Sequence, residues 1–201
     1  IAETGSSDPF AGTPTLVSVP FDTTGGNGAD GASTEPVASA NGRYVAFAST
    51  ATNLVADGGT VGRTSIYVRD MVLGTTFRVQ APGAEPDGDS SDPDLSDDGR
   101  HLVFTSEATN LSEVGPSAPA DTNGVADAFT VNLDTDGDGV IGDITINRFM
   151  STMNVAGGSS QARISGMGER VVFTAHQDTL TPTEVPTVLD GDFVYYGYLD
   201  N

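Results

Sequence analysis

Short apolar runs separated by turns rich in Gly, Asp and Asn recur along the whole chain. Tyr44–Phe47 (YVAF) and His101–Phe104 (HLVF) are two such runs, and each follows a turn dipeptide, Asn41-Gly42 or Asp98-Gly99. A continuous apolar run bounded by turn residues is typical of a strand buried on both faces. The dipeptides favour two-residue hairpins with positive φ at both central positions. No amphipathic helical pattern of useful length accompanies them, so the pattern predicts an all-β chain.

The apolar runs belong to an internal repeat. Asn41–Leu54 (NGRYVAFASTATNL) and Asp98–Leu111 (DGRHLVFTSEATNL) are identical at eight of 14 positions and lie 57 residues apart. A weaker third copy, Met167–Leu180 (MGERVVFTAHQDTL), follows 69 residues after the second. Such self-similarity indicates that one supersecondary unit is repeated along the chain.

Further strands are predicted after each copy. Third strands are expected at Ser65–Arg69, Ala128–Leu133 and Asp192–Tyr198, and fourth strands at Thr76–Gln80 and Ile144–Met150. Four strands per unit with Gly-rich hairpins are typical of β-propeller blades. We therefore expect one domain over residues 1–201, with an N-terminal arm and donor strand at 1–35, blade 1 at 36–92, blade 2 at 93–161 and an incomplete blade 3 at 162–201.

The second copy carries three motifs in a specific order. They are Ser96–Phe104 (SDDGRHLVF), Ala108–Leu111 (ATNL) and Asp121–Phe129 (DTNGVADAF). This series resembles the TolB-type, WD-repeat-like β-propeller repeats of secreted bacterial proteins. The resemblance covers most of the chain, and it implies a propeller fold with a scaffold or binding role. The first and third copies depart from it, with ADGGTVGRTS and TEVPTVLDGD in place of the DTNG element.

The repeats leave one strand unmatched at each end of the chain. Thr15–Val19 (TLVSV) is similar to a fourth strand without the three strands before it, and the chain ends directly after the third strand of blade 3. Propellers close with about 4–8 blades, and a bare strand edge promotes aggregation. We expect the last blade to be completed by the N-terminal strand of another subunit, in a ring or a filament. Two architectures remain open beside this one: an excised piece of a longer propeller, and an unusual single-chain sandwich.

Charge and composition narrow the classes of partner. The chain has 28 acidic and 8 basic residues, a formal net charge of −20, and no cysteine. This balance opposes binding to nucleic acid and to anionic membranes, and no apolar run is long enough for a membrane helix. The absence of cysteine excludes disulfides and thiolate chemistry. A chain rich in Asp, without Lys, and beginning at Ile1 fits a processed, secreted and extracellular protein.

The segment 134–143 (DTDGDGVIGD) has the spacing of a calcium loop. Asp134, Asp136 and Asp138 occupy loop positions 1, 3 and 5, and a glycine follows at position 6. This is the first half of an EF-hand-type loop, in which alternating carboxylates surround a hard cation. The carbonyl of Val140 would be the position-7 ligand, and Asp143 would close the shell directly or through water. Position 12 is Thr145 instead of the bidentate Glu, so we expect calcium binding of modest affinity, with a Kd of about 10⁻⁴–10⁻³ M. A solvated acidic turn is the alternative.

Other acidic positions are less specific. Asp121, Asn123 and Asp127 form an oxygen-rich turn, either an Asx-type hairpin or a second ion site, with the structural interpretation favoured. The Asp-rich run 87–98 is expected to be a solvated loop between blades. Within the last predicted strand, Tyr196 and Tyr198 share a face that opposes Tyr195. We expect these tyrosines to lie in the core or at a subunit interface.

No nucleophile elbow, zinc-binding motif, phosphate loop or dinucleotide fingerprint is present, so we expect no enzymatic activity. The sequence therefore predicts a non-enzymatic, extracellular structural protein: a calcium-stabilised, propeller-like subunit that assembles with itself, head to tail, by strand donation. The alternative is a peptide- or glycan-binding propeller fragment of a larger secreted or surface protein, and a hydrolase ranks third.

Overall fold

The computed structural model of the chain describes residues 13–24, 26, 28–111, 121, 124–148, 158–176 and 192–199. In these residues every regular element is a β-strand. The strands are β1 (Ser33–Ala38), β2 (Tyr44–Ser49), β3 (Ser65–Asp70), β4 (Thr75–Arg78), β5 (Ser90–Leu95), β6 (His101–Ser106), β7 (Asp127–Asn132), β8 (Thr145–Arg148), β9 (Ser159–Ile164), β10 (Arg170–His176) and β11 (Asp192–Tyr198). Within the same residues no helix has the length and apolar character needed to cross a bilayer.

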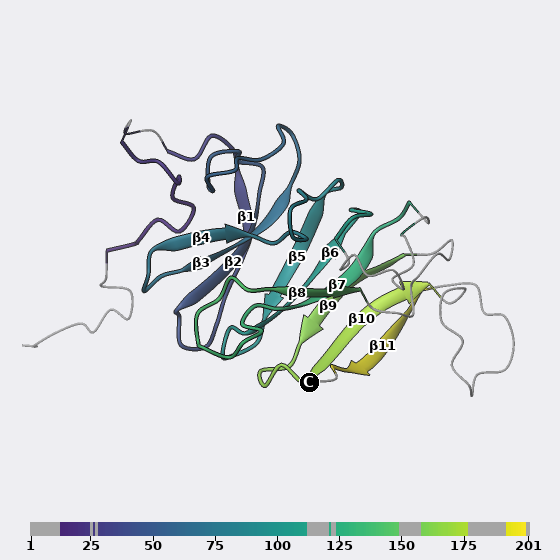
Figure 1. The fold of residues 1–201 in the computed structure, drawn as a ribbon. Coiled ribbons are helices and arrows are strands. Elements are labelled where there is room, and N and C mark those ends of the chain that lie inside the picture. Colours follow the sequence, from purple (N-terminus) through teal and green to yellow (C-terminus); the bar gives the residue numbers. More distant parts are fainter. Residues whose placement is uncertain are drawn as a thin grey trace, which may run out of the picture.

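The strands form three antiparallel sheets, each built from one repeat. Blade 1 has the order β1-β2-β3-β4, blade 2 the order β5-β6-β7-β8, and blade 3 the order β9-β10-β11. The sheets lie side by side in chain order, with blade 2 between the other two (Figure 1). The predicted all-β class is confirmed, and so are four-stranded sheets for the first two repeats. In the described residues the third sheet has three strands.

Each first strand contains the same irregularity. The pairing register shifts in the middle of β1, β5 and β9, and one residue of each strand has positive φ: Glu35 (53°), Asp92 (54°) and Gln161 (55°). These three residues occupy one position of the repeat. A bulge places an extra residue opposite its partner strand and bends the sheet locally. The bend is therefore a built-in part of every blade, although none of the three residues is a glycine.

The turn after each first strand differs from the predicted two-residue hairpin. Only the glycine of each dipeptide has positive φ, with Gly42 at 68° and Gly99 at 74°, while Asn41 and Asp98 do not. Instead, Asn41 Oδ1 accepts hydrogen bonds from Ser39 Oγ (2.8 Å) and from the Arg43 N–H (2.9 Å). The side chain thus closes a longer turn, because its oxygen replaces a backbone acceptor. The prediction of positive φ at both positions was wrong.

The A-T-N-L motif has a structural role in the first two blades. Thr109 donates its N–H and hydroxyl to the two carboxylate oxygens of Asp87, at 2.6 and 2.7 Å, and Asn110 accepts the Asp87 N–H. Thr52 and Asp30 repeat this arrangement in blade 1. The motif therefore ties the end of the second strand to the segment that enters the blade.

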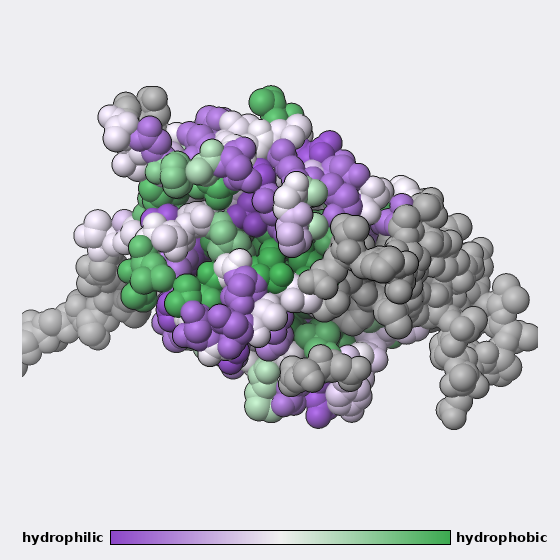
Figure 2. All heavy atoms as spheres, in the orientation of Figure 1, coloured by the Kyte–Doolittle hydropathy of each residue, from purple (hydrophilic) through white to green (hydrophobic). Residues whose placement is uncertain are grey.

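Two hydrophobic cores lie between the sheets. We call the face of a sheet that is turned toward the preceding sheet its upstream face, and the other its downstream face. The first core joins the downstream face of blade 1 to the upstream face of blade 2 and includes Ala46, Ile66, Val68, Leu102, Phe104 and Phe129. The second joins blade 2 to blade 3 and includes Val103, Ala128, Ala162, Val171 and Phe173. Figure 2 shows hydrophobic residues gathered in the middle of the visible surface, with hydrophilic residues around them.

Each upstream face carries a stacked aromatic pair. The pairs are Phe47–Tyr67, Phe104–Phe129 and Phe173–Tyr195, with ring centroids 5.8, 5.5 and 5.7 Å apart. In blades 2 and 3 the pair faces the preceding blade. In blade 1 it is covered instead by Val17, Ala29 and Val55, which come from the N-terminal arm and from the loop after β2.

Some element boundaries differ from the predicted ones. The strands β4 and β8 are shorter than the expected fourth strands, and Met150 lies outside the described residues. β1, β5 and β9 begin three residues ahead of the expected blade starts at 36, 93 and 162. Half of the Asp-rich run 87–98 forms β5 and is not a loop. Thr15–Val19 forms no strand in the single chain, because it pairs with none of the described strands.

Candidate metal centre

The predicted calcium loop connects β7 to β8 at the end of blade 2. Gly137, Gly139 and Gly142 have positive φ, at 76°, 80° and 144°, so the loop can turn sharply three times in succession. Its first acidic residue, Asp134, is 1% exposed, whereas Asp136 and Asp138 are exposed. One carboxylate oxygen of each lies within 4.8 Å of those of the other two. The structure therefore brings three of the predicted ligands together.

Asp134 is the residue that distinguishes this cluster from an ordinary acidic turn. Its Oδ2 accepts a hydrogen bond from the Gly139 N–H at 3.2 Å and lies 3.1 Å from Nε of Arg100. Its Oδ1 is buried and has no hydrogen-bond partner in the part of the chain that the structure describes. A buried carboxylate oxygen without a partner is costly, by about 1–3 kcal/mol or more. A hard cation held by the three carboxylates would satisfy it, and oxygen ligands are those that calcium prefers.

Asp143 and Val140 have other places in the loop. Asp143 Oδ2 accepts the N–H of Asp136 at 2.9 Å, and the Asp143 carbonyl accepts the hydroxyl of Thr135 at 2.6 Å. Asp143 thus closes the base of the loop and lies outside the group of three carboxylates. The Val140 N–H donates to Asp138 Oδ1 at 2.7 Å. Coordination by Asp143 and by the Val140 carbonyl stays a prediction.

Blade 1 supplies a residue that the sequence pattern did not identify. Tyr44 is 3% exposed and lies on β2, and its hydroxyl donates to the carbonyl of Gly139 at 3.1 Å. Burial raises the pKa of this hydroxyl, and the negative charges of Asp134 and Asp138 raise it too, although Arg43 lowers it. Tyr44 is therefore a neutral donor. Because the two residues are 95 positions apart, no local motif could indicate the contact.

The oxygen-rich turn of Asp121, Asn123 and Asp127 remains open as a second ion site. Asp121 is 8% exposed and Asp127 is fully buried at the start of β7. Asn123 lies outside the described residues. The structure thus places two of the three residues in the interior of the blade.

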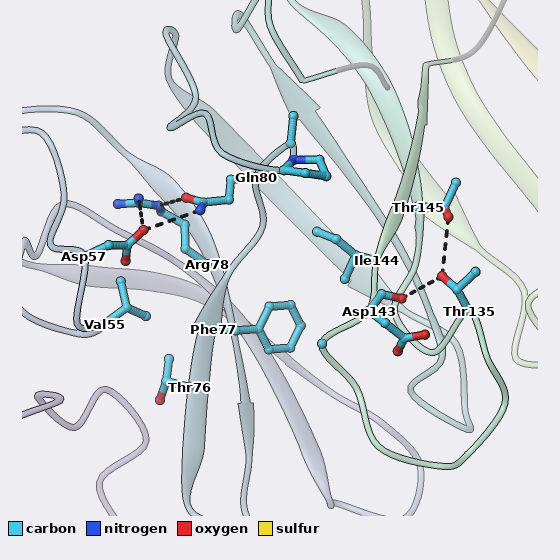
Figure 3. Close-up of a pocket in the computed structure, with 13 residues that line it drawn as sticks. Val55, Asp57, Thr76, Phe77, Arg78, Gln80, Thr135, Asp143, Ile144 and Thr145 are labelled. Carbon is cyan, nitrogen blue, oxygen red and sulfur yellow. Dashed lines mark hydrogen bonds and ion pairs between the residues drawn. The ribbon is translucent and has the colours of Figure 1, made fainter. Parts of the chain in front are cut away.

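A cleft with a volume of about 630 Å³ lies beside the calcium loop. Phe77, Arg78 and Gln80 line it from blade 1, and Thr135, Asp143, Ile144 and Thr145 line it from the loop and β8 (Figure 3). Arg78 is 6% exposed and is held by Asp57 (2.9 Å) and by Gln80 (2.7 Å). The aromatic ring of Phe77 faces the cleft, and the polar groups lie on both sides of it (Figure 3). The cleft thus combines an aromatic wall with hydroxyl and carboxylate groups.

No family model and no curated protein sequence matches the chain. Solved structures do. TolB from Acinetobacter baumannii is 17% identical with a TM-score of 0.42, and the match covers 74% of this chain and 28% of that one. The tricorn protease is 15% identical with a TM-score of 0.41, over 71% of this chain and 15% of that one.

A protein assigned as TolB from Agrobacterium tumefaciens is 18% identical, with a TM-score of 0.42 over 82% of this chain and 57% of that one. The chain therefore spans less than two thirds of each of these three proteins. Two of the three are TolB proteins, the family that the repeat motifs of the sequence resemble.

Proposed function

We propose that the chain is a non-enzymatic, extracellular structural protein, a calcium-stabilised subunit that assembles with itself head to tail by strand donation into a filament or a ring. The partner is a second copy of the chain, and the cofactor is calcium. The observation that carries the proposal is the outer edge of blade 3. In the described residues β3 and β7 each pair with a fourth strand, but nothing pairs with the far side of β11. Such an edge is a template for another strand.

The N-terminal arm is suited to fill this edge. Its residue Leu16 is 61% exposed, and Val17, which packs against the Phe47–Tyr67 pair, is only partly buried. Residues 13–24 of the arm make one described backbone hydrogen bond to blade 1, from the Phe21 N–H to the Asn53 carbonyl at 2.8 Å. Few contacts therefore have to be broken before Thr15–Val19 pairs with β11 of a neighbour. Strand addition of this kind gains its affinity from main-chain hydrogen bonds.

Calcium would stabilise the joint between blades 1 and 2. The Asp134 cluster binds the ion, and the same loop accepts the hydroxyl of Tyr44 from blade 1. A ligand that binds the folded state alone stabilises it by mass action. An extracellular location provides the calcium concentration that a site of modest affinity requires.

Light scattering after size-exclusion chromatography tests the assembly. We expect the chain to elute as a dimer or larger species, and deletion of residues 1–20 to leave a monomer with unchanged β content. The control is Val61→Asp, which adds a charge at an exposed apolar residue (87% exposed) outside the arm and should leave the assembly unchanged. A parent chain that remains monomeric at all concentrations would contradict the proposal, and electron microscopy of the assembled fraction separates a ring from a filament.

The cleft supports a second candidate function, the binding of a peptide or glycan. Aromatic rings next to hydroxyl and carboxylate groups are the usual composition of such sites. In this case a glycan or peptide array would give hits that disappear in Phe77→Ala and persist in Leu73→Ala, a substitution at an exposed residue on the adjacent turn. An array without reproducible hits would contradict the binding function, and the structural function would be the one that is left.

A further inference from the structure

The downstream face of blade 3 is exposed, although the equivalent faces of blades 1 and 2 are buried. Val172, Val194 and Tyr196 are 39%, 77% and 54% exposed. The residues at the same repeat positions are at most 8% exposed at both internal junctions: Ala46 and Val103 for Val172, Ile66 and Ala128 for Val194, and Val68 and Thr130 for Tyr196. Blade 3 therefore displays a junction face with no blade against it in the described residues.

The complementary surface lies at the opposite end of the row of sheets (Figure 1). Five of the six residues of β1 are exposed, and the sixth is Val37. The equivalent strands β5 and β9 are each partly buried, because they contact the preceding blade. Pro36 of β1 is exposed, for example, whereas Pro93 and Ala162 at the same position are buried. β1 thus presents the surface that β5 and β9 use at the internal junctions.

Two backbone hydrogen bonds recur at both internal junctions. The first strand of the following blade donates to the residue just before the third strand of the preceding blade, from Ser90 N–H to the Thr64 carbonyl (2.9 Å) and from Ser159 N–H to the Ala126 carbonyl (2.9 Å). The turns form a second series, in which Ala40 donates to the carbonyl of Asp97 (2.9 Å) and Asp97 donates to that of Gly166 (2.8 Å). In the first series, the donor position corresponds to Ser33 in blade 1 and the acceptor position to Asp192 in blade 3. In the second series, the donor position corresponds to Gly166 in blade 3 and the acceptor position to Ala40 in blade 1.

A side chain also covers the turn glycine at each internal junction. A Cβ on Gly99 would lie 2.3 Å from the Tyr44 ring, and one on Gly168 would lie 2.6 Å from His101. Nothing lies within 4 Å of the same point on Gly42. Arg170 occupies the repeat position of Tyr44 and His101, and its guanidinium lies 5.1 Å from the centre of the Tyr198 ring on the exposed face. A cationic side chain is therefore available to cover Gly42.

We propose that the downstream face of blade 3 docks on β1 and the Gly42 turn of a second copy, as each internal blade docks on the next. The inference rests on the proposed head-to-tail assembly and names its interface. At this interface the Ser33 N–H of one copy donates to the Asp192 carbonyl of the other. The Gly166 N–H donates in the reverse direction to the Ala40 carbonyl, and Arg170 lies over Gly42.

We assign a second copy as the partner because one chain exposes both surfaces of the blade-to-blade contact, the downstream face of blade 3 and the β1 surface of blade 1. The chain already makes this contact twice, between blades 1 and 2 and between blades 2 and 3. The two surfaces lie at opposite ends of the row, so they meet only between molecules. Docking also buries Val172, Val194 and the exposed tyrosines, and the removal of apolar surface from water favours association. The arm that covers the Phe47–Tyr67 pair is the segment that moves to β11 under strand donation, so the two events are compatible.

The first test uses a charge on the exposed face. Val194→Glu should reduce the assembled fraction at least tenfold by light scattering, because it would bury a carboxylate at the junction. Val72→Glu is the matched control, since Val72 is 72% exposed but lies on the turn between β3 and β4. Both variants should keep the parent β content and melting temperature as monomers, because the replaced side chains are exposed.

The second test uses the absence of native cysteine. One preparation carries Ser33→Cys and the other Val194→Cys, and the two are mixed under oxidising conditions. A disulfide requires the two Cβ atoms to be about 3.5–4.5 Å apart. At the internal junction the equivalent residues touch, since Ser159 Oγ accepts the Ala128 N–H at 2.8 Å. We expect a disulfide-linked heterodimer, and none when Val61→Cys replaces Val194→Cys.

The outcomes separate the interface from the assembly. A parent chain that stays monomeric overturns the self-assembly and this interface together. A parent that assembles, while Val194→Glu assembles equally well and Ser33→Cys forms no selective disulfide, overturns the interface alone. Strand donation would then join the two copies without contact between the downstream face of blade 3 and β1.

Discussion

Blades 1 and 2 place an acidic residue at the end of the third strand or just after it, but they satisfy it differently. In blade 1, Asp70 is 1% exposed and accepts hydrogen bonds from Arg43 and from the N–H groups of Val72 and Leu73, at 2.8–3.1 Å. In blade 2, Asp134 is equally buried and lies beside Arg100, yet one of its oxygens has no hydrogen-bond partner among the described residues. The protein itself satisfies the first carboxylate, and we propose that a cation satisfies the second.

The difference shows how one repeat acquires a specialised site. Blade 1 connects β3 to β4 by a short turn, whereas blade 2 inserts the ten-residue segment 134–143, which adds three further acidic residues to Asp134. Burial raises the pKa of the Asp70 carboxyl, but Arg43 and the two N–H groups lower it by more, so its pKa lies below the ordinary value. Substitutions in one blade, each with a control elsewhere in the chain, test whether the two blades differ in this way.

The largest effect is expected for Asp70→Ala. The change removes the acceptor of two charged and two backbone hydrogen bonds, so the free energy of unfolding should fall by about 2–3 kcal/mol. The loss should be the same with and without calcium, as measured by urea denaturation. Asp22→Ala, at an exposed carboxylate, serves as the control and should stay within about 0.5 kcal/mol of the parent. A loss that calcium reverses would contradict the comparison.

The next effect concerns the calcium loop. With calcium at about 10–100 times its Kd, the parent should gain about 1.4–2.7 kcal/mol of stability by mass action. Asp136→Asn should abolish this gain without changing the stability of the calcium-free protein, because Asp136 is exposed. Thermal unfolding and calorimetric titration measure both quantities. Asp57→Asn in blade 1 should keep the calcium response. If Asp57→Asn also abolished the response, the effect of Asp136→Asn would not be specific to the loop.

The strands and the order of the blades could be predicted because each repeat carries its own apolar run and turn glycine. Gly42 and Gly99 indicate turns independently of how the neighbouring blade packs. The carboxylate cluster could also be predicted, since Asp134, Asp136 and Asp138 are close in sequence and a loop brings them together locally.

Other features had no local signal. The positive φ of Glu35 and Asp92 follows from pairing with the second strand, and neither residue type indicates it. The contact between Tyr44 and Gly139 depends on how blade 1 packs against blade 2. Thr15–Val19 is rich in β-branched residues, as strands are, but a strand requires a partner edge, and this segment pairs with none of the described strands.

A smaller effect is expected for Tyr44→Phe. The change removes the hydroxyl that donates to the Gly139 carbonyl and keeps the ring that covers Gly99. Loss of one such hydrogen bond should cost about 0.5–1.5 kcal/mol, measured by urea denaturation. Tyr198→Phe is the matched control, because that ring is 65% exposed, and it should be neutral. Equal losses in both variants would remove the role assigned to the Tyr44 hydroxyl.

The smallest effect is a pH dependence at the junction of blades 2 and 3, where His101 takes the place that Tyr44 has in blade 1. Burial lowers the pKa of His101 below its ordinary value, although Asp98 opposes this, and its Nδ1 has no hydrogen-bond partner among the residues described. A lowered pKa means that the unfolded chain binds the proton more readily than the folded one. The stability from neutral His101 is therefore present above about pH 6.5 and is lost as the pH falls through the folded-state pKa.

His101→Tyr should remove this dependence, because it covers Gly168 of blade 3 with the residue type by which blade 1 covers Gly99 of blade 2. The urea midpoint of the parent should decrease between about pH 7.5 and 5.5, where carboxylates stay largely ionised, and that of the variant should decrease less. His176→Gln corrects for the other histidine, which lies 3.2 Å from Asp192. If the variant and the parent lose stability equally over this range, the titrating group lies elsewhere and the two junctions respond alike to acid.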